Sequence, residues 1–133
     1  MRSILKEIQI LEKLEHPNIT EYYGSYLFGN HLFVVLEYCE EGALNEIYFD
    51  MGKPLEENQV IYVCREILRA LTYLHSFGII HRDLKGANIL VNRNGQVKLT
   101  DFGFSANMLK DGKKKLRISF TGTPYWMAPV GYC

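Results

Sequence analysis

A short segment, HRDLKGANIL at residues 81–90, places polar residues that could do chemistry between two apolar runs. Asp83, Lys85 and Asn88 fall within six positions, and Asp101 follows in KLTDFG. Burying such a cluster costs free energy unless its charges are paired. For any single residue the alternative is a capped turn, because Asp and Asn often bond backbone N–H groups in loops. All four at this spacing favour a site that handles charge.

The residue types in this cluster suit phosphate chemistry. Carboxylate and amide oxygens with no His or Cys favour Mg²⁺, which keeps waters and is usually completed by substrate phosphates. Asn88 and Asp101 are the candidate ligands, and Lys85 would be a point charge for the same phosphates. Asp83 is then left to orient a hydroxyl or to accept its proton.

The stretch ILVNRNGQVKLT (89–100) predicts a hairpin around Asn94-Gly95, the strongest short-range hairpin signal. A two-residue type I′ turn sets Asn88 opposite Asp101, so that both could share one cation. A three-residue bulged turn slips the register by one and sets Asn88 opposite Thr100. The sequence leaves both registers open.

The first periodic segment predicts a helix over residues 3–15, with apolar residues at helical spacing and an end at His16-Pro17. Glu7 lies within its apolar stripe. Either it is an edge position whose carboxylate reaches solvent, or it is a partly buried carboxylate that needs a cation.

The other elements follow from apolar runs and turn signals. Two strands over 19–28 and 31–38 are joined at Gly29-Asn30, and a short helix is expected over 43–51. A long amphipathic helix over about 56–76 ends at Gly78, and residues 107–123 read as a loop with a basic run. The apolar stripe of the long helix is Val60, Cys64, Ile67, Leu71 and Leu74.

Composition favours one globular domain and excludes several classes. Lys plus Arg and Asp plus Glu both number 15, so the zero net charge gives no bulk attraction to nucleic acid or membrane. Apolar runs such as LFVV are too short to span a bilayer, and the N-terminus lacks a signal-peptide core. Three scattered cysteines without a C-x-x-C pair argue against a metal site and favour reduced thiols, so we expect a cytoplasmic protein.

Three motifs in order resemble the protein-kinase signature set: His81-Arg82-Asp83-Leu84 with Asn88, then Asp101-Phe102-Gly103, then Ala128-Pro129-Val130 in place of A-P-E. EYCEEGALNEIY, YVCREIL and GTPYWMAP resemble the sterile-20 group of serine/threonine kinases, most closely its germinal centre kinase branch. The resemblance implies an incomplete α+β protein-kinase-like fold. Residues 1–36 would be an N-lobe remnant from helix C onward, 37–42 the hinge, and 43–133 a partial C-lobe through the activation loop.

The resemblance also implies roles in transfer of the γ-phosphoryl group of ATP to a protein Ser or Thr. Asp83 would be the catalytic base, and Asn88 and Asp101 would hold Mg²⁺. Lys85 would contact the transferred phosphate, and Thr123 would pack near Asp83.

Further positions concern the nucleotide. Leu36 resembles the gatekeeper, and Glu37 to Cys39 the hinge that bonds adenine through its backbone. Leu90 resembles the floor beneath the adenine ring, and Glu7 the helix-C glutamate. His81, Phe102 and Leu11 would stack into the hydrophobic spine.

Regulation is implied at the activation loop. Arg82 resembles the arginine that grips a loop phosphate, and Ser119 sits where this group is commonly phosphorylated, with Thr121 as a second candidate. Adding about −1.5 to −2 charge near Arg82 would order the loop. An upstream kinase or autophosphorylation in trans would supply the phosphate.

Two family parts have no match in the sequence: the G-x-G-x-x-G loop and the lysine on the third strand. Val130 replaces the expected glutamate, and we hypothesise that APVGYC reflects a frameshift, a retained intron or an incomplete gene model. We therefore expect little activity and exposed apolar faces from these 133 residues alone. The rivals are a truncated non-catalytic interaction module and an unrelated metal-dependent phosphate-binding fold.

Overall fold

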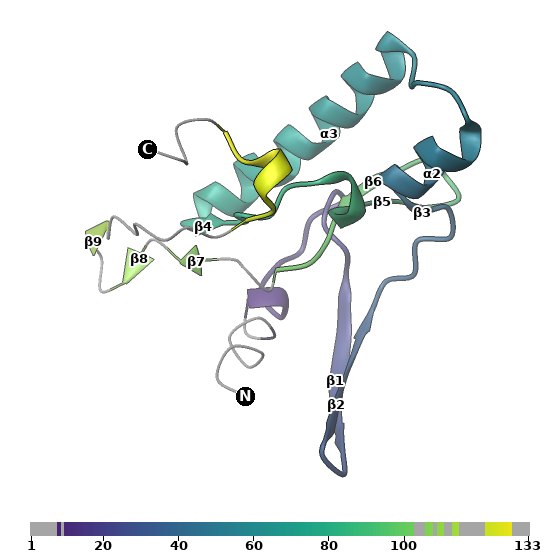
Figure 1. The fold of residues 1–133 in the computed structure, drawn as a ribbon. Coiled ribbons are helices and arrows are strands. Elements are labelled where there is room, and N and C mark those ends of the chain that lie inside the picture. The colour runs from purple at the N-terminus through teal and green to yellow at the C-terminus, as the bar shows by residue number, and fades with distance from the viewer. Residues whose placement is uncertain are drawn as a thin grey trace.

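The computed structural model describes residues 8, 10–102, 106–107, 109–110, 113–114 and 122–128. The described elements combine one long helix, one short helix and several short sheets (Figure 1). None of the described helices has the length and hydrophobicity of a transmembrane span. The α+β class expected from the sequence is confirmed. The elements in chain order are β1 (Tyr22–Phe28), β2 (His31–Leu36), β3 (Gly42–Ala43), α2 (Leu44–Met51), α3 (Glu57–Ser76), β4 (Ile79–Ile80), η1 (Gly86–Asn88), β5 (Ile89–Val91), β6 (Val97–Leu99), β7 (Ala106–Asn107), β8 (Leu109–Lys110), β9 (Lys113–Lys114) and η2 (Pro124–Trp126).

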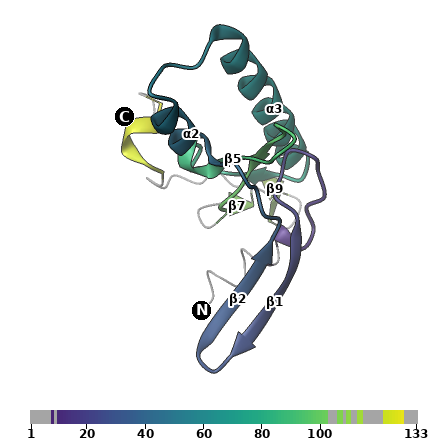
Figure 2. The same ribbon diagram turned by 90° about the vertical axis from the view of Figure 1, so that its right-hand side faces the viewer.

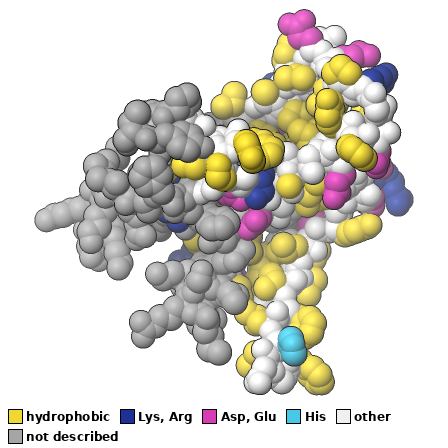
Figure 3. All heavy atoms as spheres, viewed as in Figure 1, with side chains coloured by type: hydrophobic (Ala, Val, Ile, Leu, Met, Phe, Trp, Pro, Cys, Tyr) yellow, Lys and Arg dark blue, Asp and Glu magenta, His cyan; other side chains and the backbone are white. Residues whose placement is uncertain are grey.

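Strands β1 and β2 form the predicted hairpin, which projects away from the rest of the molecule in both views (Figures 1 and 2). Phe28 pairs with His31 across Gly29-Asn30, and Gly29 adopts the left-handed φ of 59° that such a tight turn needs. The first strand begins at Tyr22 rather than at residue 19, because Ile19 instead bridges to Leu99 of β6. Apolar side chains cover much of this hairpin (Figure 3).

Both predicted helices of the middle segment are present. The N-terminus of α3 is closed by the Gln59 side chain, whose Oε1 accepts the backbone N–H of Glu56 at 2.8 Å. Its C-terminus is closed at Gly78, which has a φ of 67° and donates its N–H to His75.

Only part of the predicted apolar stripe of α3 is buried. Ile67 and Leu74 lie in the core, whereas Val60 and Cys64 are exposed. The C-terminal half of the helix packs against β4 and β6, and its N-terminal half extends beyond them (Figure 1).

The β5–β6 hairpin adopts the second of the two registers that the sequence allowed. Val91 pairs with Val97 and Ile89 with Leu99, so the pairing of Asn88 with Asp101 is wrong. The loop between Asn92 and Gln96 has three residues, because the Asn92 Oδ1 accepts the N–H groups of Asn94 and Gln96 and folds the loop around itself. Gly95 closes the loop with a φ of 74°.

The two ends of the chain differ from the sequence expectation where they are described. The helical part of the first segment stops at Leu11 rather than at residue 15. Its last turn tightens into i to i+3 bonds such as Leu14 N–H to Leu11 C=O, as often happens where a helix ends. The stretch predicted as a loop from 107 contains short strands, since β7 pairs with β4 and β8 pairs with β9.

The core lies where α3, the β5–β6 hairpin and the segment before β1 meet. It gathers Leu74 and Ala70 from α3, Leu99 from β6, Ile19 and Phe102, each at most 2% exposed. Leu11 belongs to the same cluster. These contacts fix the strand ends on which the polar residues of the site depend.

We expect Leu74→Ala to lower the free energy of unfolding by about 2–5 kcal/mol, because it leaves a cavity in this core. The matched control is Leu68→Ala on the same helix, whose side chain is 62% exposed; it should change the free energy by less than about 1 kcal/mol. Urea unfolding followed by circular dichroism measures both. Equal losses in the two variants would show that the core is not where the structure places it.

Candidate active site

The loop between β4 and η1 is shaped by the His81 ring. Its Nε2 lies 2.9 Å from the carbonyl oxygen of Thr100, and its Nδ1 lies 3.3 Å from the N–H of Asp83. A carbonyl only accepts and a backbone N–H only donates, so Nε2 carries the proton and the ring is neutral. Burial lowers the pKa of His81 below its ordinary 6.5, in agreement with a neutral ring.

The neutral ring also packs edge-on against Phe102, with ring centroids 5.3 Å apart. The loop therefore turns sharply after His81, and Arg82 takes a left-handed φ of 70°. For a residue other than glycine that conformation costs free energy, which the surrounding contacts must hold in place. The predicted stacking of His81 on Phe102 is present.

The carboxylate of Asp83 is the centre of the predicted cluster and is 2% exposed. Lys85 Nζ lies 2.8 Å from its Oδ2, and the hydroxyl of Thr123 donates to its Oδ1 at 2.5 Å. Asn88 Nδ2 donates to both the Asp83 carbonyl and its Oδ2, at 2.9 and 3.1 Å. Lys85 Nζ also donates to Thr123 at 3.1 Å. The structure thus brings together four of the residues predicted from the sequence.

This environment keeps Asp83 ionised. Burial by itself would raise the pKa of the carboxyl, but the hydrogen bonds from Lys85, Thr123 and Asn88 outweigh it and hold the pKa below the ordinary 3.8. A buried carboxylate that stays charged is a strong acceptor for a proton or for a hydroxyl group.

Asn88 is oriented in a way that suits a hard cation. Its side chain is in the buried part of the loop, and both donated bonds of Nδ2 go to Asp83. Among the described residues nothing donates to its Oδ1, which leaves a buried acceptor without a partner. Mg²⁺ is commonly held by one or two such oxygens together with substrate phosphates, so the donor set fits.

Asp101 lies one residue beyond the pairing that joins the two strands at this end. Thr100 donates its N–H to the carbonyl of Asn88 at 3.0 Å, and Asp101 follows with a left-handed φ of 63°. At this turn the chain leaves the direction of the strand, and Asp101 is exposed to solvent. Over the described stretches no three His, Cys, Asp or Glu side chains gather as a metal site.

The predicted hinge connects β2 to β3. Leu36 ends β2 half-buried, Glu37 donates its N–H to Glu21 at 2.8 Å, and Cys39 is 6% exposed. Burial raises the pKa of the Cys39 thiol, which keeps it uncharged. Within residues 10–102 the N–H of Cys39 has no acceptor, so it is available to a ligand.

Leu90 lies on β5 opposite Ala43 of β3, directly after the hinge. An apolar side chain at this position can line the site next to the hinge. The remaining predicted residues Glu7, Ser119 and Thr121 lie outside the described residues.

Two contributors were missed from the sequence. Gly122 packs closely on residues 81–88, hereafter the catalytic loop. A Cβ at Gly122 would lie 2.9 Å from the Arg82 carbonyl oxygen, so a larger residue would displace the loop. Lys98 forms an ion pair with Glu37 at 2.8 Å. Gly122 has a φ of 145°, and the only sign of this in the sequence is that the residue is a glycine. Nothing in the sequence indicates the role of Lys98, because its partner is 61 residues away.

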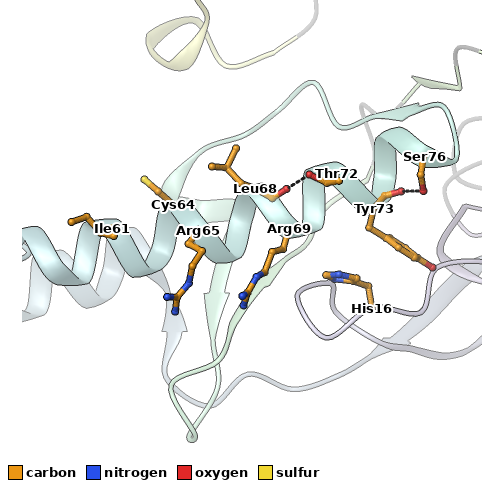
Figure 4. Close-up of a pocket in the computed structure, with 9 residues that line it drawn as sticks. All are labelled: His16, Ile61, Cys64, Arg65, Leu68, Arg69, Thr72, Tyr73 and Ser76. Carbon is orange, nitrogen blue, oxygen red and sulfur yellow. Dashed lines mark hydrogen bonds between the residues drawn. The ribbon is translucent and has the colours of Figure 1, made fainter.

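The cavities near these elements include two that differ in what lines them. One of about 220 Å³ is lined by Asp83, Thr123 and Trp126 among others, so it opens beside the cluster. Another, of about 870 Å³, lies on the outer face of α3 beside His16 (Figure 4). The Thr72 and Ser76 hydroxyls in it donate to carbonyls of the helix itself, the Tyr73 hydroxyl accepts the Glu15 N–H, and no carboxylate is among the described residues that line it. The smaller cavity is the one that belongs to the site.

The site combines a buried, ionised Asp83 carboxylate with the Lys85 ammonium and the Thr123 hydroxyl, an arrangement that suits phosphoryl-transfer chemistry. The protein kinase domain family matches residues 1–130, and the chain belongs to that family. It is 52% identical over 126 residues to serine/threonine-protein kinase dst2 of Dictyostelium discoideum and equally to mitogen-activated protein kinase kinase kinase kinase 3 of Homo sapiens. It is 46% identical over 123 residues to serine/threonine-protein kinase 1 of Arabidopsis thaliana.

These matches cover 92–95% of the chain but only 11–14% of the relatives' own lengths. They confirm the resemblance to the germinal centre kinase branch of the sterile-20 group, which the motifs had indicated. They exclude the unrelated phosphate-binding fold as a reading of the sequence.

We expect the contribution of Asp83 to stability to depend on pH. Because its folded pKa is depressed, ionised Asp83 stabilises the fold above pH 3.8, and this stabilisation is lost as pH falls below 3.8 through the folded pKa. The free energies of unfolding of the natural protein and of Asp83→Asn, measured by urea titration, should therefore differ near neutral pH and converge in acid. A difference that stays constant across that range would contradict the assignment.

Proposed function

We propose that the chain provides catalytic residues of a serine/threonine protein kinase, which transfers the γ-phosphoryl group of ATP to a Ser or Thr of a protein substrate. The observation that carries the proposal is the buried Asp83 carboxylate, held ionised by Lys85, Thr123 and Asn88. Residues 1–36 would belong to the N-lobe, 37–42 to the hinge and 43–133 to the C-lobe. Membership of the protein kinase family makes ATP and Mg²⁺ the expected cofactors.

Asp83 would act on the acceptor hydroxyl. Its two oxygens together offer about four lone-pair positions, of which the donors Thr123, Lys85 and Asn88 use three. The remaining position would accept the hydroxyl hydrogen and hold the hydroxyl oxygen in line with the γ-phosphorus. As the new P–O bond forms and the bond to the β-phosphate oxygen breaks, the proton passes to the carboxylate.

Lys85 and Thr123 would orient the base and the phosphate. The ammonium already contacts Asp83, so it stands where a transferred phosphoryl group would gain from a positive charge. The Thr123 hydroxyl bridges Asp83 and Lys85 and comes from the segment before η2. The catalytic loop and that segment are thus joined at the reacting position.

The nucleotide would lie between the hinge and the β5–β6 hairpin. Its adenine would bond backbone groups of Glu37 and Cys39, next to Leu36 and above Leu90. When bound, Mg²⁺ would neutralise phosphate charge, and Asn88 and Asp101 would hold it. Glu7 would anchor the phosphate-binding lysine of the complete family fold.

Regulation and location complete the proposal. Arg82 would pair with phosphate on Ser119, with Thr121 as the second position, after action of an upstream kinase or autophosphorylation in trans. The described cysteines Cys39 and Cys64 are free thiols, in accord with a cytoplasmic signalling role.

We expect Asp83→Asn to lower kcat for phosphorylation of a Ser/Thr peptide by about 100-fold to 10,000-fold, because the base is lost while the shape is kept. Binding of ATP, measured by calorimetry in the full-length protein, should change by less than about threefold. The comparison separates the enzyme from its rival, a non-catalytic interaction module. The interaction module would be supported instead if the natural protein binds partners but its phosphotransfer activity is no higher than that of Asp83→Asn.

A further inference from the structure

A largely buried ion pair joins the start of the hinge to the β5–β6 hairpin. Lys98 Nζ lies 2.8 Å from each carboxylate oxygen of Glu37. The two side chains are only 10% and 16% exposed. Desolvation offsets much of the attraction in such a pair, so its main effect is on where the carboxylate lies rather than on stability.

The position of that carboxylate changes the hydrogen bonding at the end of the β1–β2 ladder. Glu37 donates its N–H to the carbonyl of Glu21, as one half of an antiparallel pair. In a regular pair the two residues exchange both bonds, so Glu21 N–H would donate to the Glu37 carbonyl. Here Glu21 N–H donates to Glu37 Oε2 instead, at 3.2 Å.

The consequence is a hinge carbonyl without an internal donor. Across residues 10–102, which include both strands and the hairpin, nothing donates to the Glu37 carbonyl. The Glu37 side chain has taken the ladder bond that its own carbonyl would otherwise receive. Lys98 is the cation that fixes that side chain in place.

We propose that Lys98 is a positioning residue for the base of the nucleotide: by holding the Glu37 carboxylate on the Glu21 N–H, it keeps the Glu37 carbonyl open to an amine of the ligand. This inference rests on the proposed function, because it takes the hinge as the base-binding segment. An open carbonyl accepts the exocyclic amine of adenine. It cannot bond the O6 oxygen of guanine, because both atoms are acceptors and repel each other.

The rest of the hinge is tethered independently. Glu41 donates its N–H to the Val91 carbonyl at 3.1 Å, and Arg93 donates its N–H to Glu40 at 3.0 Å. Neither bond involves Lys98, so we expect both to persist when Lys98 is replaced. Removing the ammonium therefore frees only the first hinge residue, and the catalytic loop around Asp83 keeps its contacts.

The test is Lys98→Met in the full-length protein, with kcat and KM determined separately for ATP, GTP and a Ser/Thr peptide. We expect KM for ATP to rise about tenfold and the preference for ATP over GTP to fall by a similar factor, as for the weakening of one hydrogen bond. The kcat and the KM for the peptide should change by less than about threefold. Lys98→Arg keeps the charge and should restore most of the ATP preference.

Arg93→Met is the matched control on the same hairpin. It removes an exposed cation that lies 4.0 Å from Glu40 but leaves the backbone bond from residue 93 intact. Its KM values should equal those of the natural protein. An ATP preference that is unchanged in Lys98→Met, or a fall in kcat alone, overturns the inference.

The same measurements separate this inference from the function on which it depends. Calorimetric titration of the natural protein with ATP and with GTP shows first whether an adenine nucleotide binds. If neither nucleotide binds, the proposed function fails, and the role of Lys98 fails with it. If ATP binds and Lys98→Met binds ATP and GTP in the natural ratio, only the role of Lys98 is wrong.

Discussion

The burial of one carboxylate organises the site. Asp83 lies almost wholly out of water, where an unpaired charge costs several kcal/mol, so the fold must supply donors for it. Lys85 and Asn88 come from the same loop, but Thr123 comes from 40 residues further along the chain. The need to satisfy Asp83 therefore ties two distant segments together. The close approach of Gly122 to the catalytic loop follows from the same closure.

Strand β6 and its neighbours position that loop from behind. Directly after β6, the Thr100 carbonyl accepts a hydrogen bond from the His81 ring. Within β6, Leu99 donates its N–H to Asn18 and accepts the N–H of Thr20. Asn18 in turn donates from its side chain to Glu66 of α3 and to the Val97 carbonyl. Strand β6 and the residue after it are thus hydrogen-bonded, directly or through Asn18, to the long helix, the segment before β1 and the catalytic loop. Hydrogen bonds, as well as the apolar core, fix their relative positions.

Local signals predicted the fold better than they predicted contacts between distant residues. Gly29 and Gly78 marked a turn and a helix end correctly, because each adopts a left-handed φ that the sequence alone suggests. The dipeptide Asn94-Gly95 located the hairpin but left its register open, because the side chain of the preceding Asn92 decides it: Asn92 caps the loop and adds a residue to it. In the site, the spacing of Asp83, Lys85 and Asn88 was informative because one loop holds them. The pairing of Lys98 with Glu37 could not be predicted from the sequence, because no periodicity links a strand lysine to a residue 61 positions away.

The register of the β5–β6 hairpin connects the two halves of the proposed site. Asn88 precedes β5 and Asp101 closely follows β6, whereas the other end of the hairpin bonds the hinge segment through Val91 and Arg93. Three residue pairs separate these ends, which is roughly 10 Å at 3.3 Å per residue. In the observed register Lys98 lies opposite Leu90, so both side chains share one face. A slip of one residue would turn one of them to the opposite face, and the loop built around Asn92 is what prevents it.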